Sequence, residues 1–443
     1  MGSRPGPCLV VCLCLVVVAA HVQQRDTQGT EFVFSLPPTV LVEPAVATLF
    51  VTAWSSPEPT EVRLQIGELG PVESRRARPY QTVSFDLPAP GCGDGDGAGG
   101  RPCRDRGLGP GLAALHALNA TVRLRASAEV SVRCLLGRTG RRNLFTAFPA
   151  DSLGADYLVV SSPRATLSHV TVTSTRNDTR VTIAGIRGRF PTRGWQLRPD
   201  RDGEEAVEVL LDEGRSLHVH SPADLTGLRI SADRPLAVLS ADESLASLVV
   251  QQLPPVVAWG RSFVLAHFRF GEVSPPAGGM YDDPPAFRVV AARSGTSLAL
   301  DGLSLGLNLS ASAWYDYRPA GSSSPDLVRL LRASQPVLVA RFTATSALLV
   351  APTNQYAPWP SHSEPDGPWF LSLVGSEVTA AVQVFQAYRC RDDGDQRRGA
   401  LYGGPAYTVR GSDGVQCVQR VSYEVVPLAG GGALNGSATA VVP

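Results

Sequence analysis

The sequence predicts an all-β protein built from repeated units of antiparallel strands. Short segments such as HVTVTST, TRVTIAG and SLHVHS alternate apolar and polar residues, the period expected of strands with one buried face. Turn-forming residues separate these segments, and the chain contains 43 Gly and 36 Pro, enough for a turn after every strand. Apolar residues at helical spacing are scarce, whereas three sequence marks recur along the chain in a fixed order.

The first mark, Gly-x-x-aromatic followed by apolar residues, opens each repeated unit. It begins at Gly29, Gly154, Gly260 and, in a looser form, Gly367. The last two steps are 106 and 107 residues, and the first is longer because residues 92–111 form a Gly-rich insertion. Because the aromatic position returns in every unit, we expect it to anchor the core of each unit.

Two further marks lie inside each unit, in the same order. The second spaces Arg, Thr, two apolar residues and Gly in the same way from Arg176 and from Arg293, and Thr60 begins a weaker copy. The third is Leu-Arg-x-Ser followed by a Val-rich strand, and it begins at Leu124, Leu228 and Leu331. Three ordered marks at matching steps indicate a true repeat.

We divide the domain, residues 29–443, into about 3.5 units, which cover approximately residues 29–140, 150–245, 256–345 and 365–443. Each unit of about 105 residues has room for roughly six to eight strands, because strands average five to six residues and turns are short. Two four-stranded sheets per unit would make a β-propeller of about seven blades, and one β-sandwich per unit would make a tandem array. We favour the propeller-like arrangement because no linker-like stretch separates the units.

Residues 1–20 have the features of a secretory signal peptide. Arg4 precedes an apolar run from Cys8 to Ala20 that ends in small residues. The run is too short for a comfortable membrane span, and no later run approaches the roughly 20 apolar residues that a spanning helix needs. We therefore expect a secreted chain without a membrane span.

The expected compartment bears on two sets of residues. Sequons for N-glycosylation, which need a surface position, occur at Asn119, Asn177, Asn308 and Asn435. Closely spaced cysteines are expected to form disulfide bonds in an oxidising compartment, namely Cys92 with Cys103 and Cys390 with Cys417. Cys134 lies in an apolar run and is expected to be a buried thiol.

No motif in the sequence predicts catalysis, a cofactor or a bound metal. Gly214-Arg-Ser216 and Gly260-Arg-Ser262 begin like a nucleophile elbow but lack its closing Gly. HExxH, CxxC and phosphate-binding loop motifs are absent. The 40 basic and 40 acidic residues balance, which gives no indication of a nucleic-acid partner. We therefore predict a protein without enzymatic activity.

A few residues are weaker candidates for binding. His218 and His220 lie two apart on a predicted strand and share a face, but no third zinc ligand accompanies them. The Asp residues of 94–96 and 392–395 lie in Gly-containing loops without the spacing of a calcium-binding EF-hand. The aromatic residues of 314–317 and 356–359 could anchor a sugar or a partner, and a core position is the favoured interpretation.

One stretch of the chain carries a family resemblance. Its residues are Val250-Gln251-Gln252-Leu253-Pro254-Pro255 and Ala258-Trp259-Gly260, supported by Leu225-Thr226-Gly227, Pro235–Ser240 and Leu153–Val159. This set resembles the N-terminal domain of the IgG Fc-binding protein family, with Gln251, Gln252, Pro254, Trp259 and Gly260 as the family motif. The resemblance is clearest between residues 140 and 345.

The resemblance implies a secreted, mucus-associated glycoprotein whose domain is named for binding immunoglobulin Fc. Residues 241–249 lack the cysteine pair that precedes the Gln-Leu-Pro segment in the family pattern. The chain also lacks the cysteine-rich von Willebrand D modules of larger members. No family motif assigns Fc contacts to particular residues, so none is transferred.

We therefore expect a secreted, extracellular module that binds or adheres to proteins without catalysis, with immunoglobulin Fc or mucin-type glycoproteins as candidate partners. An enzyme that acts on glycans from a β-propeller scaffold, and a structural component of mucus or matrix, are the alternatives. Trp259 is expected to be buried and specific to its unit, because Gln28 and Leu153 stand at the equivalent positions.

Overall fold

A computed structural model describes most of the chain between residues 27 and 440. The described residues are 27–37, 46–53, 58–68, 70–79, 81–87, 114–118, 121–138, 141–163, 165–185, 197–199, 205–243, 248–268, 286–319, 326–342, 347–352, 369–375, 379–389, 406–411, 414–427 and 436–440. The predicted signal peptide, residues 1–20, lies outside them.

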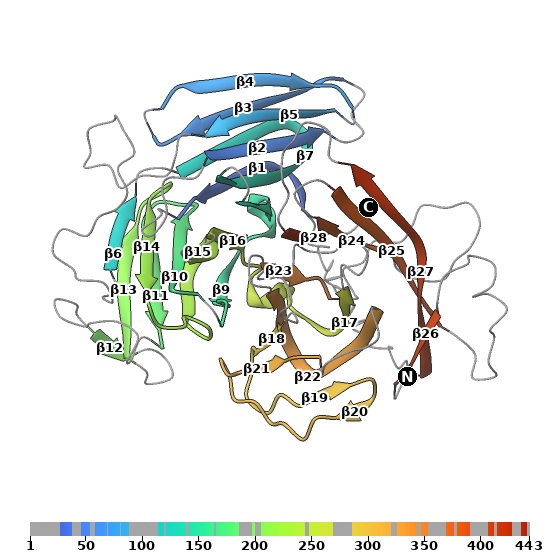
Figure 1. Cartoon of the computed structure of the whole chain (residues 1–443). Helices are drawn as coiled ribbons and strands as arrows, with labels where there is room; N and C mark the ends of the chain where they lie inside the picture. Colours follow the sequence, from blue (N-terminus) through green and yellow to red (C-terminus); the bar gives the residue numbers. More distant parts are fainter. Residues whose placement is uncertain are drawn as a thin grey trace, which may run out of the picture.

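The described strands form four antiparallel sheets that, apart from β6, follow one another along the chain. Figure 1 shows them around a common centre, with the first sheet in blue at the top and the second in green at the left. The third, in yellow and orange, lies at the bottom, and the fourth, in red, lies at the right. The prediction of an all-β repeat protein is confirmed.

The strands of each sheet, with two 3₁₀ turns between sheets, have the following bounds. The first sheet contains β1 (Gln28–Ser35), β2 (Val46–Ala53), β3 (Thr60–Ile66), β4 (Val72–Ala77), β5 (Thr82–Leu87), β7 (Thr121–Arg138) and β8 (Arg141–Ala147). The second contains β6 (Ala114–Leu118), β9 (Gly154–Leu158), β10 (Leu167–Ser174), β11 (Thr179–Ala184), β12 (Leu197–Pro199), β13 (Glu205–Leu211), β14 (Ser216–Ser221), β15 (Arg229–Glu243) and β16 (Leu248–Gln252). The third contains β17 (Gly260–Phe268), β18 (Ala286–Ala291), β19 (Leu298–Leu300), β20 (Leu303–Ser304), β21 (Trp314–Tyr317), β22 (Asp326–Phe342) and β23 (Ala347–Val350). The fourth contains β24 (Trp369–Gly375), β25 (Thr379–Arg389), β26 (Ala406–Gly411), β27 (Gly414–Pro427) and β28 (Gly436–Ala440). The 3₁₀ turns are η1 (Ala150–Ser152) and η2 (Val256–Ala258).

One long strand organises each of the first three sheets, namely β7, β15 and β22. The first half of the long strand pairs with the first and third strands of its unit. Its second half pairs with the second strand and with the short strand that closes the unit. The register shifts between the two halves, so a single curled sheet takes the place of two flat ones.

This long strand explains why the expected number of about seven blades is wrong. Each unit forms one curled sheet, not two four-stranded sheets, because both halves share the same strand. The described strands therefore make four sheets of seven, nine, seven and five strands. Their closing strands meet at the centre: β8 contacts β16, β16 contacts β23, β23 contacts β28, and β28 contacts β8. The arrangement is radial, as in a propeller.

The three sequence marks have defined places in this topology. The Gly of the first mark pairs with the residue that begins the second half of the long strand, in the pairs Gly29–Val130, Gly154–Leu236 and Gly260–Val337. The aromatic residue three positions later is buried in these three units, as Phe32, Tyr157 and Phe263. The mark therefore anchors the cores of the first three units, as expected, and Gly367, which opens the fourth unit, lies outside the described residues.

The third mark needs a correction in the second unit. In the ladders, Ala126, Ala232 and Ala333 occupy the same place, opposite the first apolar residue of the third strand. Leu228-Arg-Ile-Ser therefore lies two residues before the true equivalent, which begins at Ile230. A shift of two residues keeps every side chain on its own face of the sheet, so the apolar pattern alone could not reveal it.

Neighbouring sheets share their apolar cores. The core of the first sheet includes residues of the second, namely Ala237, Leu239, Ala241 and Val250. The core of the second sheet includes residues of the third, namely Val290, Leu338, Ala340 and Phe342. Because each core is completed by the next unit, the first three units are parts of one folded body.

Candidate functional site

The family-like stretch forms the connector between the second and third sheets. Here residues 253–259 are called the second connector, and residues 148–153, between the first and second sheets, the first connector. Each contains a 3₁₀ turn that follows an extended proline and ends at a buried apolar residue, Leu153 or Trp259. Proline fixes the extended entry and the apolar residue fixes the exit, so the repeat sequence specifies both connectors.

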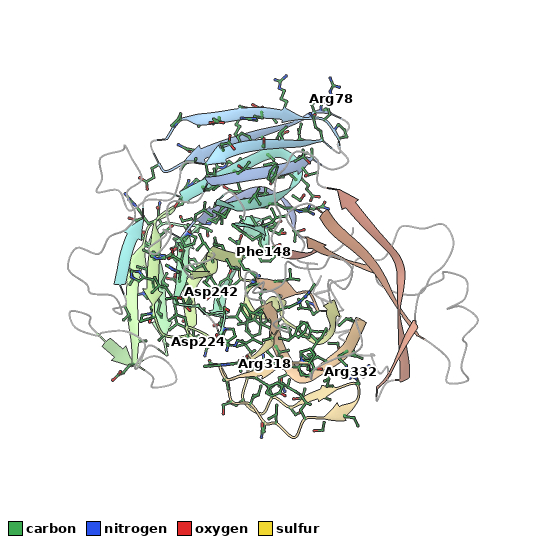
Figure 2. All side chains as sticks on the ribbon, in the orientation of Figure 1. Arg78, Phe148, Asp224, Asp242, Arg318 and Arg332 are labelled. Carbon is green, nitrogen blue, oxygen red and sulfur yellow. The ribbon has the colours of Figure 1, made fainter. Side chains whose placement is uncertain are left out.

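Gln252 joins the two connectors. Its side chain is 1% exposed, and its Oε1 accepts a hydrogen bond from the backbone N–H of Phe148, with an N–O distance of 2.9 Å. Phe148 lies near the centre of the molecule (Figure 2). Nε2 of Gln252 has no hydrogen-bond partner among the described residues. Gln252 therefore has a structural role, because it joins two segments whose contacting residues are 104 positions apart in sequence. Gln251 beside it pairs with Ser240 within the second sheet.

Trp259 is a core residue. It is 7% exposed and belongs to the core cluster of the second sheet. Its Nε1–H donates to the backbone carbonyl of Pro254 at 3.1 Å, which closes the connector on itself. Gly260 follows at once as the first residue of β17. Of the family motif residues, Trp259 thus packs in the core that the second and third sheets share.

The upstream Leu225-Thr226-Gly227 segment lies against the third sheet. Gly227 has a φ of +80°, in the left-handed region that favours glycine. A Cβ at Gly227 would lie 2.3 Å from the backbone carbonyl oxygen of Ser312, so only glycine allows this approach. Leu225 is fully buried and the Thr226 hydroxyl accepts a hydrogen bond from the third sheet. The segment is therefore a contact surface between two units.

Arg288 of β18 is the donor in that contact. Its guanidinium donates to both carboxylate oxygens of Asp316, at 2.7 and 2.8 Å, and its Nη1 donates to Asp224 at 2.6 Å and to Thr226 Oγ1 at 2.8 Å. The side chain is 3% exposed and stacks over the ring of Trp314. We call Arg288, Asp224, Asp316 and Thr226 the arginine lock. Asp224 lies where the second sheet meets the third (Figure 2).

The positive charge of Arg288 is stabilised by the two carboxylates that it contacts. Burial alone would lower the pKa of Arg288, but its hydrogen bonds and ion pairs with Asp316 and Asp224 outweigh burial and raise that pKa. Bidentate pairing of a guanidinium with a carboxylate is directional as well as strong. A glycan-hydrolysing site would need two carboxyl groups facing a substrate across a gap, whereas Asp224 and Asp316 are both bound to Arg288.

Asp242 of β15 is a buried acid near this lock. It accepts hydrogen bonds from the Ser162 N–H at 2.7 Å and from the Ser168 hydroxyl at 3.3 Å. Burial raises the pKa of Asp242 to about 7, and the negative charge of Asp224 adds to that rise. Asp242 therefore takes up a proton near neutral pH.

The sequence pair His218 and His220 lies in the interior rather than on a solvent face. His169 of β10 joins them, and all three side chains are at most 2% exposed. We call these residues the histidine cluster. His169 Nδ1 lies 3.3 Å from His218 Nε2, and His169 Nε2 lies 3.1 Å from the carboxylate of the buried Glu243. Sequence reasoning missed His169 and Glu243, which the pairing of β10 with β14 and β15 brings together.

A chain of hydroxyl groups continues from the histidine cluster into the first sheet. Thr171 Oγ1 lies 3.0 Å from His218 Nδ1. Ser216 Oγ lies 2.9 Å from Thr173 Oγ1 and 2.5 Å from Ser35 Oγ of β1. We call Ser35, Thr121, Thr173 and Ser216 the hydroxyl chain. It lines the junction between the first and second sheets with buried hydrogen bonds.

The remaining sequence candidates have the following positions. Asn177 and Asn308 are exposed, and Asn177 lies in a turn. Cys134 is buried and unpaired, and burial raises the pKa of its thiol. The aromatic residues of 314–317 are half-buried. Cys417 lies in β27. Candidates outside the described residues are Asn119, Asn435, Cys92, Cys103, Cys390, Tyr356, Trp359 and the Asp residues of 94–96 and 392–395.

Among the described residues, no group of three or more His, Cys, Asp or Glu side chains is arranged to hold a metal ion. In the histidine cluster the ring nitrogens instead lie within hydrogen-bond distance of one another, of Thr171 and of Glu243. In the same part of the chain, no helix is long and apolar enough to cross a membrane.

The fold and these contacts define a radial β-repeat protein whose sheets are fastened to one another by buried polar groups. A family model described as IgGFc binding protein matches residues 144–367, just over half of the 443 residues. The chain therefore belongs to the IgGFc binding protein family, as the resemblance implied. The match covers the connectors, the histidine cluster and the arginine lock. Neither a curated protein nor a solved structure matches the chain.

Proposed function

We propose that the chain is a secreted, non-catalytic module that binds or adheres to proteins in extracellular or mucosal fluid. Immunoglobulin Fc and mucin-type glycoproteins are the proposed partners. Membership of the IgGFc binding protein family carries this proposal, because the family is described by that interaction. The radial arrangement suits the role, since binding residues are commonly carried by loops that a packed scaffold positions.

The proposed domain comprises residues 29–443, with a signal peptide at residues 1–20 and units near the boundaries given above. Exposed positions of Asn177 and Asn308 support glycosylation at these sequons. The pairs Cys92–Cys103 and Cys390–Cys417 are proposed disulfide bonds of an oxidising compartment. A structural component of mucus or matrix is the alternative, in which the chain associates with itself instead of binding a foreign partner.

Binding is tested by immobilising Fc, Fab and purified mucin on separate biosensor surfaces and passing the secreted chain over each. Retention on Fc or mucin, with none on Fab, supports the proposal. No retention on Fc or on mucin, for a sample shown to be folded, contradicts it. Sedimentation of the chain alone distinguishes the structural role, because self-association would then appear without either partner.

Export is tested by expressing the full chain in a mammalian cell line and examining the medium. We expect a product that begins after the signal peptide and loses mass on treatment with an N-glycosidase. Peptide mapping without reduction should recover the two proposed disulfide pairs. Retention of the whole product inside the cell, without glycan, would contradict an extracellular role.

A further inference from the structure

The glycosylation sequon at Asn177 is held in a tight turn between β10 and β11. Asp178, its middle residue, has a φ of +53°, in the left-handed region that Asp tolerates. The Oδ1 of Asn177 accepts a hydrogen bond from the backbone N–H of Glu213 at 3.1 Å, and its backbone carbonyl accepts one from Arg234 at 2.7 Å. The turn is therefore tied both to the segment before β14 and to β15.

The third residue of that sequon, Thr179, is fully buried. It is the first residue of β11 and pairs with Leu211 of β13. Its hydroxyl donates to the backbone carbonyl of Arg176 and accepts from the Ser174 hydroxyl, both at 2.7 Å. The hydroxyl of the Asn177 sequon is thus enclosed within the folded sheet.

The sequon at Asn308 has a different environment. Asn308 and Ser310 are both exposed, and they lie in the segment between β20 and β21. Leu309 between them forms an isolated bridge with Thr296, outside the strands of the sheet. The hydroxyl residue of this sequon therefore lies on the surface, in contrast to Thr179.

Glycan transfer to asparagine uses both ends of a sequon. The amide Nδ2 forms a bond to the first carbon of the sugar and loses a proton. At the same time the bond between that carbon and the pyrophosphate of a lipid-linked oligosaccharide breaks, and the pyrophosphate leaves with the electron pair. The requirement for Ser or Thr at the third position indicates that the transferase also recognises this hydroxyl. A folded sequon therefore accepts a glycan only if its asparagine and its hydroxyl are both accessible.

We propose that Asn177 receives its glycan only before the second sheet has formed, whereas Asn308 remains an acceptor in the folded chain. This inference rests on the proposed secretion and glycosylation of the chain. The folded turn is compatible with a glycan that is already attached, because Asn177 is exposed and its hydrogen bond from Glu213 uses Oδ1 and not Nδ2. Occupancy of Asn177 therefore depends on how the rate of glycan transfer compares with the folding rate of the second unit.

The proposal is tested with the chain without residues 1–20, expressed in a bacterial host that adds no glycans and shown to be folded by a cooperative unfolding transition. The folded chain is incubated with purified oligosaccharyltransferase and a lipid-linked oligosaccharide. Synthetic peptides of residues 171–185 and 302–316 are the references, so each sequon is compared with its own unfolded form. Mass spectrometry of the digested chain measures the rate at each sequon.

Folding should lower the rate at Asn177 at least about tenfold more than the rate at Asn308, because β11 must open before the Thr179 hydroxyl becomes accessible. Equal losses at the two sequons, or an Asn177 rate in the folded chain that equals the peptide rate, overturn the proposal. Failure of both peptides to accept a glycan is a different result, which contradicts the proposed glycosylation itself. Failure of the Asn177 peptide alone overturns the proposal, since Asn177 would then receive no glycan at any stage.

Substitutions of two neighbouring residues in β11 assign the low rate to the folded sheet. Val181→Asp places a carboxylate at a fully buried position of the apolar core and should open the second sheet. Arg180→Gln changes an exposed side chain and should leave the sheet intact. We expect the Asn177 rate to rise towards the peptide rate in Val181→Asp and to stay low in Arg180→Gln, in parallel with amide exchange of β11. A low Asn177 rate in a chain whose β11 amides exchange freely would contradict the proposal.

Discussion

The junction between the first and second sheets and the junction between the second and third sheets have side chains of different chemistry at equivalent positions. In the second unit the cross-strand pair that faces the preceding sheet is Thr171 and His218, and in the third unit it is Arg288 and Asp316. The equivalent pair in the first unit is Phe50 and Ser84. Each unit therefore has a cross-strand pair at the same place in its sheet, and the residue types of that pair differ from unit to unit.

The difference lies in how the stabilisation is distributed. The arginine lock concentrates several charge-assisted hydrogen bonds on one guanidinium. The hydroxyl chain distributes neutral hydrogen bonds over several residues, each worth about 1 kcal/mol. Single substitutions should therefore have unequal effects at the two junctions, and the following predictions run from the largest expected effect to the smallest.

Arg288→Ala should have the largest effect. It leaves two carboxylates and the Thr226 hydroxyl without their donor, and removal of one partner from a buried ion pair costs about 3–5 kcal/mol. Urea unfolding measures the loss. Arg288→Lys should restore only part of it, because an ammonium cannot bind Asp316 in a bidentate fashion.

The control for that lock is Arg180→Ala. Arg180 pairs with Glu208 at 3.0 Å, but its side chain is 60% exposed, so its loss should cost less than about 1 kcal/mol. Equal effects of the two arginine substitutions would show that the buried lock contributes no more than a surface pair.

Trp259→Ala should follow, with a loss of about 3 kcal/mol, because it removes a buried aromatic side chain from the core that the second and third sheets share. Thermal unfolding measures the change. The equivalent substitution in the first connector, Leu153→Ala, should cost about 2–3 kcal/mol. An unchanged unfolding temperature for Trp259→Ala would place that ring on the surface.

Ser216→Ala tests the distributed junction. It removes the hydroxyl that lies within hydrogen-bond distance of Ser35, Thr121 and Thr173, and we expect a loss of about 1–2 kcal/mol. Ser74→Ala, which removes an exposed hydrogen bond to Glu61, is the matched control with an effect near zero. A loss as large as that of Arg288→Ala would contradict the distributed model.

Asp242→Asn should have the smallest effect, and its sign should depend on pH. The pKa of Asp242 is raised to about 7 in the folded chain, so the folded form holds this proton more tightly than the unfolded form. The resulting stability is fully present below the ordinary Asp value of about 3.9 and is lost as the pH rises through about 7. Because Asn cannot ionise, the variant should gain stability relative to the wild type between pH 5 and pH 8. Urea midpoints at both values measure the difference, and a constant offset would contradict the proton uptake.

The pH dependence of stability is expected to be local. Asp242, whose side chain lies on the face of β15 opposite the histidine cluster, loses its stabilising proton as the pH rises through about 7. Exchange measured strand by strand is therefore more informative than a single unfolding temperature.

Much of the fold could be predicted from local patterns. Alternation indicated strands, and the recurring glycine and aromatic positions located the first strand of each unit, as Gly154 and Tyr157 illustrate. The number of sheets could not be predicted, because one strand serving two halves of a sheet looks like two strands in sequence. The third mark at Leu228 was misplaced by two residues for a related reason: a shift by an even number of residues leaves the apolar alternation unchanged.

The polar junctions were harder to predict because they depend on register. His169 and His218 are 49 residues apart, and only the pairing of β10 with β14 makes them neighbours. The sequence did contain one indication of both junctions. In each, a titratable residue lies in a segment that otherwise has no charged residue, as with His169 in HVTVTS and Arg288 in AFRVVA. Such residues are buried only with partners, so each one predicts a partner on a neighbouring strand.

The strand β6 has a consequence for how the units can be separated. It comes from the chain segment of the first unit but pairs with β14 at the edge of the second sheet. Removing residues 114–118 would leave that edge unpaired, and an unpaired edge is a template for a strand from another molecule. The first unit thus supplies in cis the strand that would otherwise be recruited in trans. A fragment cut between the first and second units should therefore exchange strands between copies, and the intact chain protects itself against this.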